Sequence, residues 1–273
     1  MSDFDVILLD LDGVVYIGTD PVPGAVEAIT ALVRAGVRCC YVTNNASRTP
    51  RQVAEHLRDL GLPATDDDVV TSSQAGAALV AGFVTGGEVL AVGGEGVRWA
   101  LAERGFDPVS RFTNSTVAVM QGYGPAVGWA DLAEATFAVR AGLPWIATNL
   151  DRTFPTPRGA APGNGALVHL VAETAGRSPD AVAGKPEPAL LQEAVRRTGA
   201  LRPLMVGDRL DTDIAAASRL GIPSLLVLTG ICDEGQARAA VGDEIGTFIA
   251  SDLAALLPGG HLASWPGAAE GAR

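Results

Sequence analysis

The sequence predicts an α/β fold with a parallel sheet, and three apolar runs that end in polar residues support this prediction. Val6–Leu9 leads into Asp10, residues 37–42 lead into Thr43, and a third run ends at Asp208. Short aliphatic runs without alternation are typical of strands buried on both faces of a parallel sheet. Because ligands of open α/β sheets bind at the carboxyl ends of the strands, the three polar ends mark a candidate site.

Strands and helices alternate along the first part of the chain. After the first strand, a helix is expected over residues 23–35 and a second one over residues 49–60. Each is followed directly by a glycine, Gly36 and Gly61, which is a common stop for a helix. A third helix of small residues is expected after Thr71, whose hydroxyl suits a helix cap.

A second unit follows from about Gly82 and ends near Asp180. It has expected strands near residues 88–92, 116–121 and 145–148, and expected helices near residues 96–104, 129–141 and 163–174. We therefore expect a discontinuous core domain (1–81 and 181–257), an inserted α/β domain (82–180) and a C-terminal tail (258–273). The tail has little pattern, so we expect it to be mobile or loosely docked.

The first polar strand end carries two carboxylates one residue apart, in Asp10-Leu11-Asp12-Gly13. Two like charges at the end of a buried strand are unfavourable unless a cation or a reaction uses them. The alternative is a surface turn, since Asp and Gly are common turn residues. The third end, Asp208, is the strand-end residue itself, whereas Asp211 and Asp213 could simply favour the dipole of the helix that follows.

The second polar end reads Thr43-Asn44-Asn45-Ala46-Ser47. Small polar side chains and backbone amides at a strand end can form a nest for phosphate oxygens. The alternative is an Asx or Ser/Thr turn before the next helix, and the two interpretations are compatible. Farther along, Lys185 stands between Gly184 and Pro186 and would be rigidly presented to a phosphate, although a lone lysine in a turn is usually solvated.

The composition limits the class of protein. The chain has 273 residues, 48% of them hydrophobic, and 20 basic against 31 acidic residues give a net charge of −11. This acidity argues against binding to nucleic acid or to an acidic membrane. The three cysteines show no metal-ligand spacing and no disulfide framework, and neither a signal peptide nor a membrane span is expected, so we expect a cytoplasmic protein. Gly93-Gly94-Glu95-Gly96 lacks the full dinucleotide-loop spacing, and a tight turn is favoured there.

In chain order the sequence carries Asp-x-Asp, Thr-Asn-Asn, a lysine, and Gly-Asp followed by a further Asp. This set resembles the haloacid dehalogenase superfamily of phosphotransferases over about residues 5–255. Residues 10–16, 43–48 and 184–186 look like class IIA, which holds sugar-phosphate and nucleotide phosphatases, 4-nitrophenyl phosphatases, phosphoglycolate phosphatase and pyridoxal-phosphate phosphatase. Residues 128–133, 162–165 and 207–214 are most similar to bacterial glycerol-3-phosphate phosphatases.

The resemblance implies a Rossmann-like core with an inserted α/β cap, and a magnesium-dependent phosphomonoester hydrolase. It assigns Asp10 as the nucleophile that forms an aspartyl-phosphate, and Asp12 as the general acid and base. Asp10, Asp208 and the backbone carbonyl of Asp12 would hold Mg²⁺, and Asp213 would orient a water bound to the metal. In this superfamily phosphate-ester hydrolases have an acid at the position of Asp12, whereas ion-pumping ATPases have a threonine.

The resemblance also implies binding roles. Thr43, Asn44, Asn45 and the catalytic Lys185 would bind the phosphate. Four residues of the cap, at or after its third strand, would determine specificity for the alcohol part of the substrate: Asn149, Asp151, Phe154 and Asn164. The last of these lies between two glycines that allow close backbone approach, and residues 152–154 and 163–165 are expected in loops. Where pyridoxal-phosphate phosphatase has a cap histidine, this chain has Phe154, which argues against pyridoxal phosphate.

We expect a small phosphorylated metabolite as substrate, with glycerol 3-phosphate first. Phosphoglycolate, a sugar phosphate and a nucleoside monophosphate stay open. A non-catalytic phosphate sensor predicts the loss of at least one of Asp10, Asp12, Lys185 or Asp208, and all four are present. A phosphomutase would need a way to keep the phosphate from water, which nothing in the sequence signals. A homodimer formed through the cap is a further open expectation.

Overall fold

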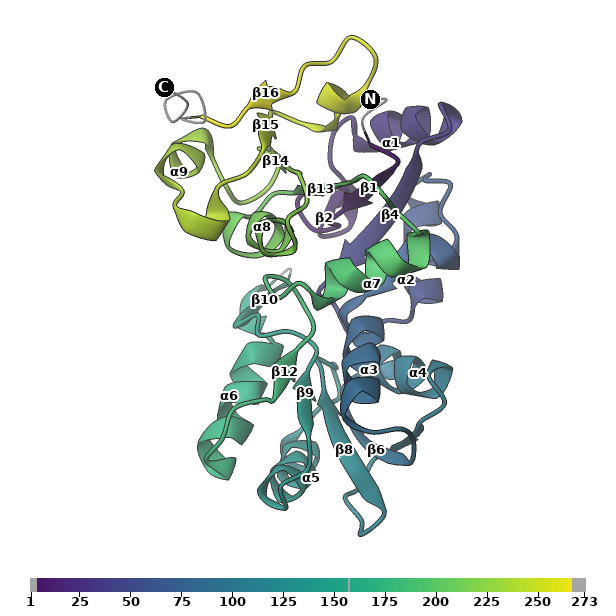
Figure 1. Cartoon of the computed structure of the whole chain (residues 1–273), viewed down its shortest axis with the longest axis vertical. Helices are drawn as coiled ribbons and strands as arrows, with labels where there is room; N and C mark the ends of the chain where they lie inside the picture. Colours follow the sequence, from purple (N-terminus) through teal and green to yellow (C-terminus); the bar gives the residue numbers. More distant parts are fainter. Residues whose placement is uncertain (1–3, 157, 267–273) are drawn as a thin grey trace. The chain divides into compact units, whose positions relative to one another are not determined.

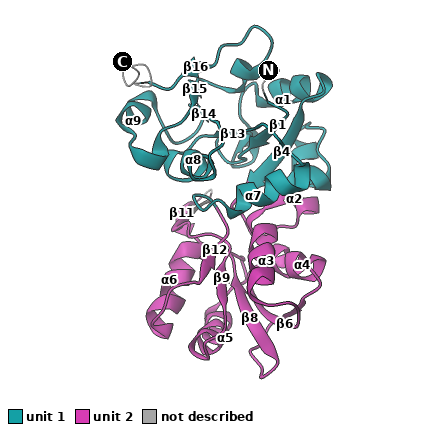
Figure 2. Cartoon of the chain, viewed as in Figure 1, with its two compact units in different colours: residues 1–42, 54–69, 185–273 teal, residues 43–53, 70–184 magenta. Residues whose placement is uncertain are grey.

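The computed structural model of the chain describes residues 4–156 and 158–266, apart from the side chains of residues 154 and 155. Its contacts divide the chain into two compact units, coloured separately in Figure 2: residues 1–42, 54–69 and 185–273, and residues 43–53 and 70–184. The proposed inserted domain, residues 82–180, lies within the second unit. Across the described ranges, no helix has the length and apolar character needed to cross a membrane.

A seven-stranded sheet with the order β16-β15-β14-β13-β1-β4-β5 organises the first unit (Figure 1). β1 pairs in parallel with β13 on one side and with β4 on the other. Its four aliphatic residues are all buried, as a central parallel strand requires. The strands are β1 (Val6–Leu9), β4 (Arg38–Thr43), β5 (Val69–Thr71), β13 (Pro203–Gly207), β14 (Ser224–Val227), β15 (Phe248–Ala250) and β16 (Ala263–Ser264).

Helices accompany this sheet. The helix α1 (Ala25–Arg34) buries four apolar residues at the i, i+3, i+4, i+7 spacing of one helix face. Gly36 follows it with a φ of 82°, a left-handed conformation that glycine adopts easily. The further helices are α2 (Pro50–Asp59), α7 (Ala189–Thr198), α8 (Ala215–Leu220) and α9 (Glu234–Ala239), with a π-helical turn at Leu210–Ile214 and 3₁₀ turns at Asp66–Asp68, Gly242–Glu244 and Leu253–Leu256. A small hairpin joins β2 (Tyr16–Ile17) and β3 (Asp20–Pro21).

A five-stranded sheet with the order β12-β9-β8-β6-β7 organises the second unit, and its neighbouring strands run parallel. Its strands are β6 (Glu88–Val92), β7 (Asp107–Val109), β8 (Thr116–Gln121), β9 (Trp145–Ala147) and β12 (Ala181–Val182). A separate hairpin pairs β10 (Thr153–Thr156) with β11 (Gly159–Pro162). The helices are α3 (Ser72–Phe83), α4 (Glu95–Glu103), α5 (Trp129–Arg140) and α6 (Asn164–Ala175).

Both faces of the second sheet are covered by apolar clusters. Along β6, Val89 and Ala91 pack into a cluster with residues of α3 and α4. Leu90 and Val92, which alternate with them, pack into a cluster with residues of α5 and α6. Alternate side chains of a strand point to opposite faces, so the apolar run of β6 fills two cores. The predicted α/β class with parallel sheets is thus confirmed.

Most predicted elements have the expected place, and the strands over residues 88–92 and 116–121 have the expected bounds. The prediction of loops over residues 152–154 and 163–165 is wrong, because β10 begins at Thr153 and α6 begins at Asn164. The hairpin was hidden by Pro155, Pro162 and Gly159, which are residue types that favour turns over strands.

The expectation of a loosely docked tail is wrong for its first half. Ala263 and Ser264 form β16, which pairs antiparallel with β15 at the edge of the sheet. Trp265 is only 4% exposed and packs in an apolar cluster with residues of the π-helical turn, β14, α9 and β15. A buried tryptophan with a two-residue strand is too short a pattern to stand out in the sequence.

We expect Trp265→Ala to destabilise the protein by about 3 kcal/mol, because the large-to-small change leaves a cavity in a packed cluster. Trp129→Ala is the matched control, since Trp129 is 82% exposed, and it should change the free energy of unfolding by less than about 0.5 kcal/mol. Urea denaturation of both variants measures this difference. Equal stability of the two variants would show that the tail does not contribute to the folded core.

Candidate functional site

Two acidic side chains meet at the carboxyl ends of neighbouring strands. Asp10 follows β1 and Asp208 follows β13, and these strands are paired in parallel with Leu9 opposite Val206. The Asp10 amide continues this pairing by donating to the Val206 carbonyl over 2.9 Å. Asp10 is 9% exposed and Asp208 is 1% exposed. The parallel register therefore holds two carboxylates next to each other with little access to water.

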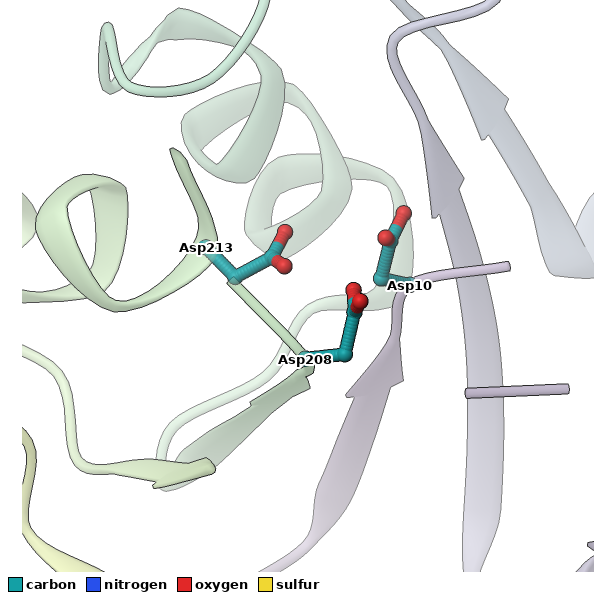
Figure 3. A group of neighbouring side chains, drawn as sticks. All are labelled: Asp10, Asp208 and Asp213. Carbon is teal, nitrogen blue, oxygen red and sulfur yellow. The ribbon is translucent and has the colours of Figure 1, made fainter. Parts of the chain in front are cut away.

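Asp213 joins them from the π-helical turn that follows β13 (Figure 3). It is fully buried, and Asp10, Asp208 and Asp213 each offer a carboxylate oxygen within 4.8 Å of the others. The dipole explanation that the sequence allowed fits Asp211, which is exposed and pairs with Arg209 over 2.8 Å. It does not account for Asp213, because a carboxylate that only favours a helix dipole has no need to be buried beside two others.

Lys185 is buried within this acidic cluster. Its Nζ lies 2.6 Å from Oδ1 of Asp10 and 2.7 Å from Oδ1 of Asp213. The residue is 3% exposed, so the solvated lysine that the sequence left open is not what the structure contains. One ammonium group thus faces two carboxylates, and the third, Asp208, has no such ion pair among the described residues.

Burial dominates the protonation of the cluster. Desolvation raises the pKa of Asp10 to about 6 even though Lys185 acts in the opposite direction. Desolvation followed by the charge of Asp213 raises the pKa of Asp208 to about 6, and desolvation followed by the charge of Asp10 raises the pKa of Asp213 to about 6. Burial acts to lower the pKa of Lys185, but Asp10 and Asp213 hold it above its usual value. Near neutral pH the cluster therefore carries three carboxylates and one ammonium.

The donor set suits a hard divalent cation. Oδ2 of Asp208 accepts a hydrogen bond from the Ile231 amide over 2.9 Å. Oδ1 of Asp208 is buried and has no hydrogen-bond partner in the described part of the chain. A buried carboxylate oxygen without a partner is costly, and a cation that prefers oxygen ligands would satisfy it. The residues present thus fit a metal ion at this position.

Asp12 differs from Asp10 in its surroundings. It is exposed, whereas Gly13 beside it is buried and has a φ of 81°. The Gly13 amide donates to the Tyr16 carbonyl over 2.8 Å, which closes a tight turn directly after β1. The turn interpretation of this motif therefore holds, and it is compatible with the site interpretation, which stays a prediction. An exposed carboxyl group next to buried carboxylates is a suitable arrangement for exchanging protons with a bound substrate or water.

The polar residues after β4 form local turns. The Asn45 amide donates to Oγ1 of Thr43 over 3.0 Å, and the Ser47 amide donates to Oδ1 of Asn45 over 3.0 Å. Hydroxyls of the helix α3 hold the same loop from outside: Ser72 donates to the Asn44 carbonyl over 2.7 Å. The Ser/Thr and Asx turns that the sequence allowed are thus present.

The cap residues lie in one hydrogen-bond network with this loop. Nδ2 of Asn44 donates to Oδ2 of Asp151 over 3.1 Å, and Nδ2 of Asn149 donates to the Asn44 carbonyl over 2.7 Å. Nδ2 of Asn164 donates to the Asn149 carbonyl over 2.8 Å and to the Gln121 carbonyl over 3.3 Å. The second unit therefore brings together three residues expected to select the alcohol and one expected to bind phosphate.

The two glycines around Asn164 lie against the chain's own backbone. A Cβ on Gly165 would lie 2.1 Å from the Leu150 carbonyl oxygen, and one on Gly163 would lie 2.3 Å from that of Asp151. The close approach expected from the sequence is therefore to the loop that carries Asp151. Phe154 lies in β10, but its side chain is outside the described residues.

The glycines at residues 93–96 also serve backbone packing. The Gly96 amide donates to the Ser47 carbonyl over 3.1 Å, and a Cβ on Gly96 would lie 2.3 Å from the Arg48 carbonyl oxygen. A dinucleotide loop needs its glycine amides to face a pyrophosphate. Here the start of α4 faces carbonyl oxygens of the chain, which agrees with the tight turn favoured by the sequence.

Sequence reasoning missed residues 229–231, which follow β14. The Thr229 hydroxyl donates to the Gly13 carbonyl over 2.6 Å, and the Ile231 amide is the donor to Asp208 described above. A signal was present, since a threonine and a glycine directly follow the apolar run of residues 225–228. Nothing in that pattern shows which carboxylate the segment reaches.

Comparison with known proteins places the chain in a family. Residues 7–107 match the haloacid dehalogenase-like hydrolase family, and residues 182–256 match a second family described as HAD-hydrolase-like. The D-glycerol 3-phosphate phosphatase of Mycobacterium tuberculosis is 48% identical over 256 residues, which cover 93% of this chain and 71% of that protein. The chain belongs to the haloacid dehalogenase-like hydrolases. An acid sugar phosphatase of Staphylococcus aureus is 38% identical over 233 residues, 85% of this chain and 89% of that protein.

Solved structures of phosphatases agree with this placement. The glycerol phosphate phosphatase of Mycobacterium tuberculosis in complex with magnesium has a TM-score of 0.88 and 47% identity, over 92% of this chain and 76% of that one. The p-nitrophenyl phosphatase of Archaeoglobus fulgidus has a TM-score of 0.83 and 29% identity, over 92% of this chain and 97% of that one. The family expected from the sequence motifs is confirmed.

The raised acid pKa values predict how a divalent cation stabilises this hydrolase at different pH values. The pKa values of Asp10, Asp208 and Asp213 rise from 3.8 to about 6 on folding. Between pH 3.8 and about 6 the folded state therefore holds more protons than the unfolded state, so the contribution of these groups to stability falls as pH rises through this window. Above about pH 6 the carboxylates are ionised and ready for a cation.

We therefore expect Mg²⁺ to raise the melting temperature at pH 7.5 and to raise it much less at pH 5, where protons compete for the same oxygens. At a hundredfold excess over Kd, binding adds about 2.7 kcal/mol to the free energy of unfolding. Thermal melts with and without Mg²⁺ at both pH values measure the difference. Asp208→Asn should lose most of the gain at pH 7.5. Equal gains at the two pH values would contradict binding at this cluster.

Proposed function

We propose that this chain is a magnesium-dependent phosphomonoester hydrolase that acts on a small phosphorylated alcohol, with glycerol 3-phosphate as the leading candidate. The observation that supports it is the contact of the buried Lys185 with Asp10 at the carboxyl end of β1, beside Asp208 and Asp213. The three carboxylates could hold a metal ion that binds the phosphate dianion, and the Lys185 ammonium adds a fixed positive charge beside it. The unpaired thiols of Cys39, Cys40 and Cys232 are consistent with a cytoplasmic location.

In this proposal Asp10 is the nucleophile. Lys185 engages its Oδ1 at 2.6 Å, which fixes the carboxylate and leaves Oδ2 to attack phosphorus. The attack forms a bond between Oδ2 and phosphorus and breaks the ester bond, so the alcohol leaves with the electron pair. Since the pKa of Asp10 is about 6, the carboxylate is ionised and nucleophilic at neutral pH. The product of this step is an aspartyl-phosphate.

Asp12 serves both halves of the reaction. Its carboxyl group donates a proton to the leaving alkoxide, and its carboxylate then takes a proton from the water that attacks phosphorus. The second attack breaks the bond between Asp10 and phosphorus, which releases inorganic phosphate and restores the carboxylate. The exposed position of Asp12 at the turn after β1 supports a role in contact with substrate and water.

Asp10, Asp208 and the backbone carbonyl of Asp12 would hold Mg²⁺, and Asp213 would orient one of its waters. The ion would offset the charge of the nucleophile and of the phosphoryl oxygens. Asp213 also accepts an ion pair from Lys185 at 2.7 Å, so it fixes the ammonium that faces the nucleophile. Oδ1 of Asp208, buried without a partner in the described chain, is the ligand atom that the structure supports best.

Thr43, Asn44 and Asn45 remain the proposed phosphate-binding residues, because they end or directly follow β4, the neighbour of β1 in the sheet. Asn149, Asp151 and Phe154 remain proposed to select the alcohol. For Asn164 the contacts favour an indirect role: it is 1% exposed and holds the Asn149 carbonyl. We therefore propose that it positions the loop that contacts substrate.

Glycerol 3-phosphate comes first because the relative with 48% identity is a D-glycerol 3-phosphate phosphatase. A sugar phosphate is the second candidate, because the relatives with 38% identity are acid sugar phosphatases. Asp151 and Asn149 offer carboxylate and amide groups that could hydrogen-bond the hydroxyls of either alcohol. Phosphoglycolate and nucleoside monophosphates have no such support among these relatives.

Asp12→Asn tests the proton-transfer role. We expect kcat for an alkyl phosphate to fall by about 10²–10⁴, because the amide cannot donate to the leaving alkoxide. The first step with 4-nitrophenyl phosphate should suffer less, since its leaving group needs no proton. Burst kinetics of both esters measure the two steps. Asp20→Asn, at an exposed aspartate of β3, is the control and should keep wild-type rates. Equal loss of the first step for both esters would count against the acid role.

A substrate panel tests the choice of alcohol. We expect kcat/KM for one enantiomer of glycerol 3-phosphate to exceed the values for a hexose 6-phosphate, phosphoglycolate and AMP by at least about 10-fold, because a few pocket contacts commonly discriminate by this amount. Asp10→Asn, purified in parallel, should release no phosphate and so controls for contaminating phosphatases. A preference for the hexose phosphate would move the assignment to the acid sugar phosphatases, and AMP as best substrate would refute it.

A further inference from the structure

The segment of residues 229–231 lies beside the acidic cluster without contributing a carboxylate to it. It follows β14, which pairs in parallel with β13 and has Leu226 opposite Gly207. The strand that precedes this segment is thus the neighbour of β13, the strand that Asp208 directly follows. Nothing in the mechanism above uses Thr229, Gly230 or Ile231 as a group that touches the substrate.

This segment fixes one oxygen of Asp208. The Ile231 amide donates to Oδ2 over 2.9 Å, and the next amide, of Cys232, donates to the Asp208 carbonyl over 3.3 Å. The second oxygen, Oδ1, has no hydrogen-bond partner in the described residues and is buried. The backbone after β14 therefore decides which of the two oxygens stays available as a metal ligand.

Two glycines leave the space that this carboxylate occupies. A Cβ on Gly230 would lie 2.0 Å from Oδ2 of Asp208, and a Cβ on Gly13 would lie 2.5 Å from the same atom. Gly230 itself is exposed, whereas Asp208 is 1% exposed, so the glycine covers the carboxylate from the outside. A side chain at either position would turn Oδ1 away from its present direction.

Thr229 ties the same segment to the turn after β1. Its hydroxyl donates to the Gly13 carbonyl over 2.6 Å, while the Gly13 amide donates to the Tyr16 carbonyl over 2.8 Å. The peptide group between Asp12 and Gly13 is therefore fixed by the hydrogen bond of the Gly13 amide. The next peptide group, between Gly13 and Val14, is fixed by the hydrogen bond to the Gly13 carbonyl. The carbonyl of Asp12, a proposed metal ligand, is fixed by these two bonds.

We propose that residues 229–231 are the positioning element of the metal site, and that Thr229 and Gly230 set the direction of two ligands, the Asp208 carboxylate and the Asp12 carbonyl. This inference rests on the proposed role of Asp208 as a metal ligand. Residues that orient ligands through hydrogen bonds, without touching the metal, commonly change metal affinity by about 10- to 100-fold when they are replaced.

The test is metal binding measured apart from turnover. We expect Thr229→Val, which keeps the shape of the side chain and removes its hydroxyl, to weaken Mn²⁺ binding by about 10-fold, read as free Mn²⁺ by electron paramagnetic resonance. Thr229→Ser keeps the hydroxyl and should bind Mn²⁺ as the wild type does. Thr198→Val is the matched control, because its hydroxyl donates to the Ala194 carbonyl over 2.7 Å at the end of α7. It should leave Mn²⁺ affinity unchanged.

A turnover readout separates positioning from a general loss of structure. The Mg²⁺ concentration for half-maximal hydrolysis of 4-nitrophenyl phosphate should rise in Thr229→Val by the same factor as Kd for Mn²⁺, and KM for the ester at saturating Mg²⁺ should stay near the wild-type value. Gly230→Ala should bind Mn²⁺ more weakly than Thr229→Val, and its circular dichroism and melting temperature show whether it folds. If it does not fold, the comparison of Thr229→Val with Thr229→Ser decides alone.

Asp208→Asn distinguishes the failure of this inference from the failure of the proposed function. If Asp208→Asn binds Mn²⁺ with wild-type affinity, Asp208 is not a ligand, and both the assigned metal site and this inference are overturned. If Asp208→Asn loses Mn²⁺ while Thr229→Val binds it as tightly as the wild type does, the metal site stands and only the positioning role is refuted.

Discussion

The ion pair between the buried Lys185 and Asp10 is the interaction on which the candidate site depends. Lys185 lies 2.6 Å from Asp10 and 2.7 Å from Asp213, while Asp208 completes the group without an ion pair among the described residues. Removing one partner of a buried ion pair leaves a charge without compensation, which is strongly unfavourable. Three carboxylates and one ammonium leave two negative charges in excess. The fold keeps this excess in place, and a divalent cation is the group whose charge and oxygen preference would balance it.

The surrounding structure holds the like-charged side chains of Asp10, Asp208 and Asp213 close together. The parallel pairing of β1 with β13 places Asp10 and Asp208 at adjacent strand ends. Glycine then makes room for the carboxylates, since a Cβ on Gly207 would lie 2.1 Å from that of Asp213 and one on Gly230 would lie 2.0 Å from Oδ2 of Asp208. Regular strands fix the backbone, and the absence of a side chain at these two positions lets the acids pack against it. The close packing of the carboxylates therefore requires both the strand register and the two glycines.

The sequence predicts features that depend on neighbouring residues better than contacts between residues far apart in the chain. The apolar runs of β1 and β13 end in acids, so the fold class and the position of Asp10 and Asp208 were predictable from local pattern. The burial of Lys185 was not, because a lysine between Gly184 and Pro186 has the same local pattern whether it is solvated or paired, and the family resemblance assigned it only to phosphate binding. The role of Thr229 was also hidden, because its partner Gly13 lies 216 residues away.

In the second unit, amide side chains join loops that are distant in the sequence. Asn44 donates to Asp151 and Asn149 donates to the Asn44 carbonyl, while Asn164 holds the Asn149 carbonyl in turn. The loop proposed to recognise the alcohol and the loop proposed to bind phosphate thus share their hydrogen bonds. A substitution at Asn149 or Asp151 therefore removes a hydrogen bond from the loop of Asn44 as well, although the Asn44 carbonyl keeps the bond from the Ser72 hydroxyl. If these roles hold, substitutions at the two positions that change the choice of alcohol should change phosphate binding as well.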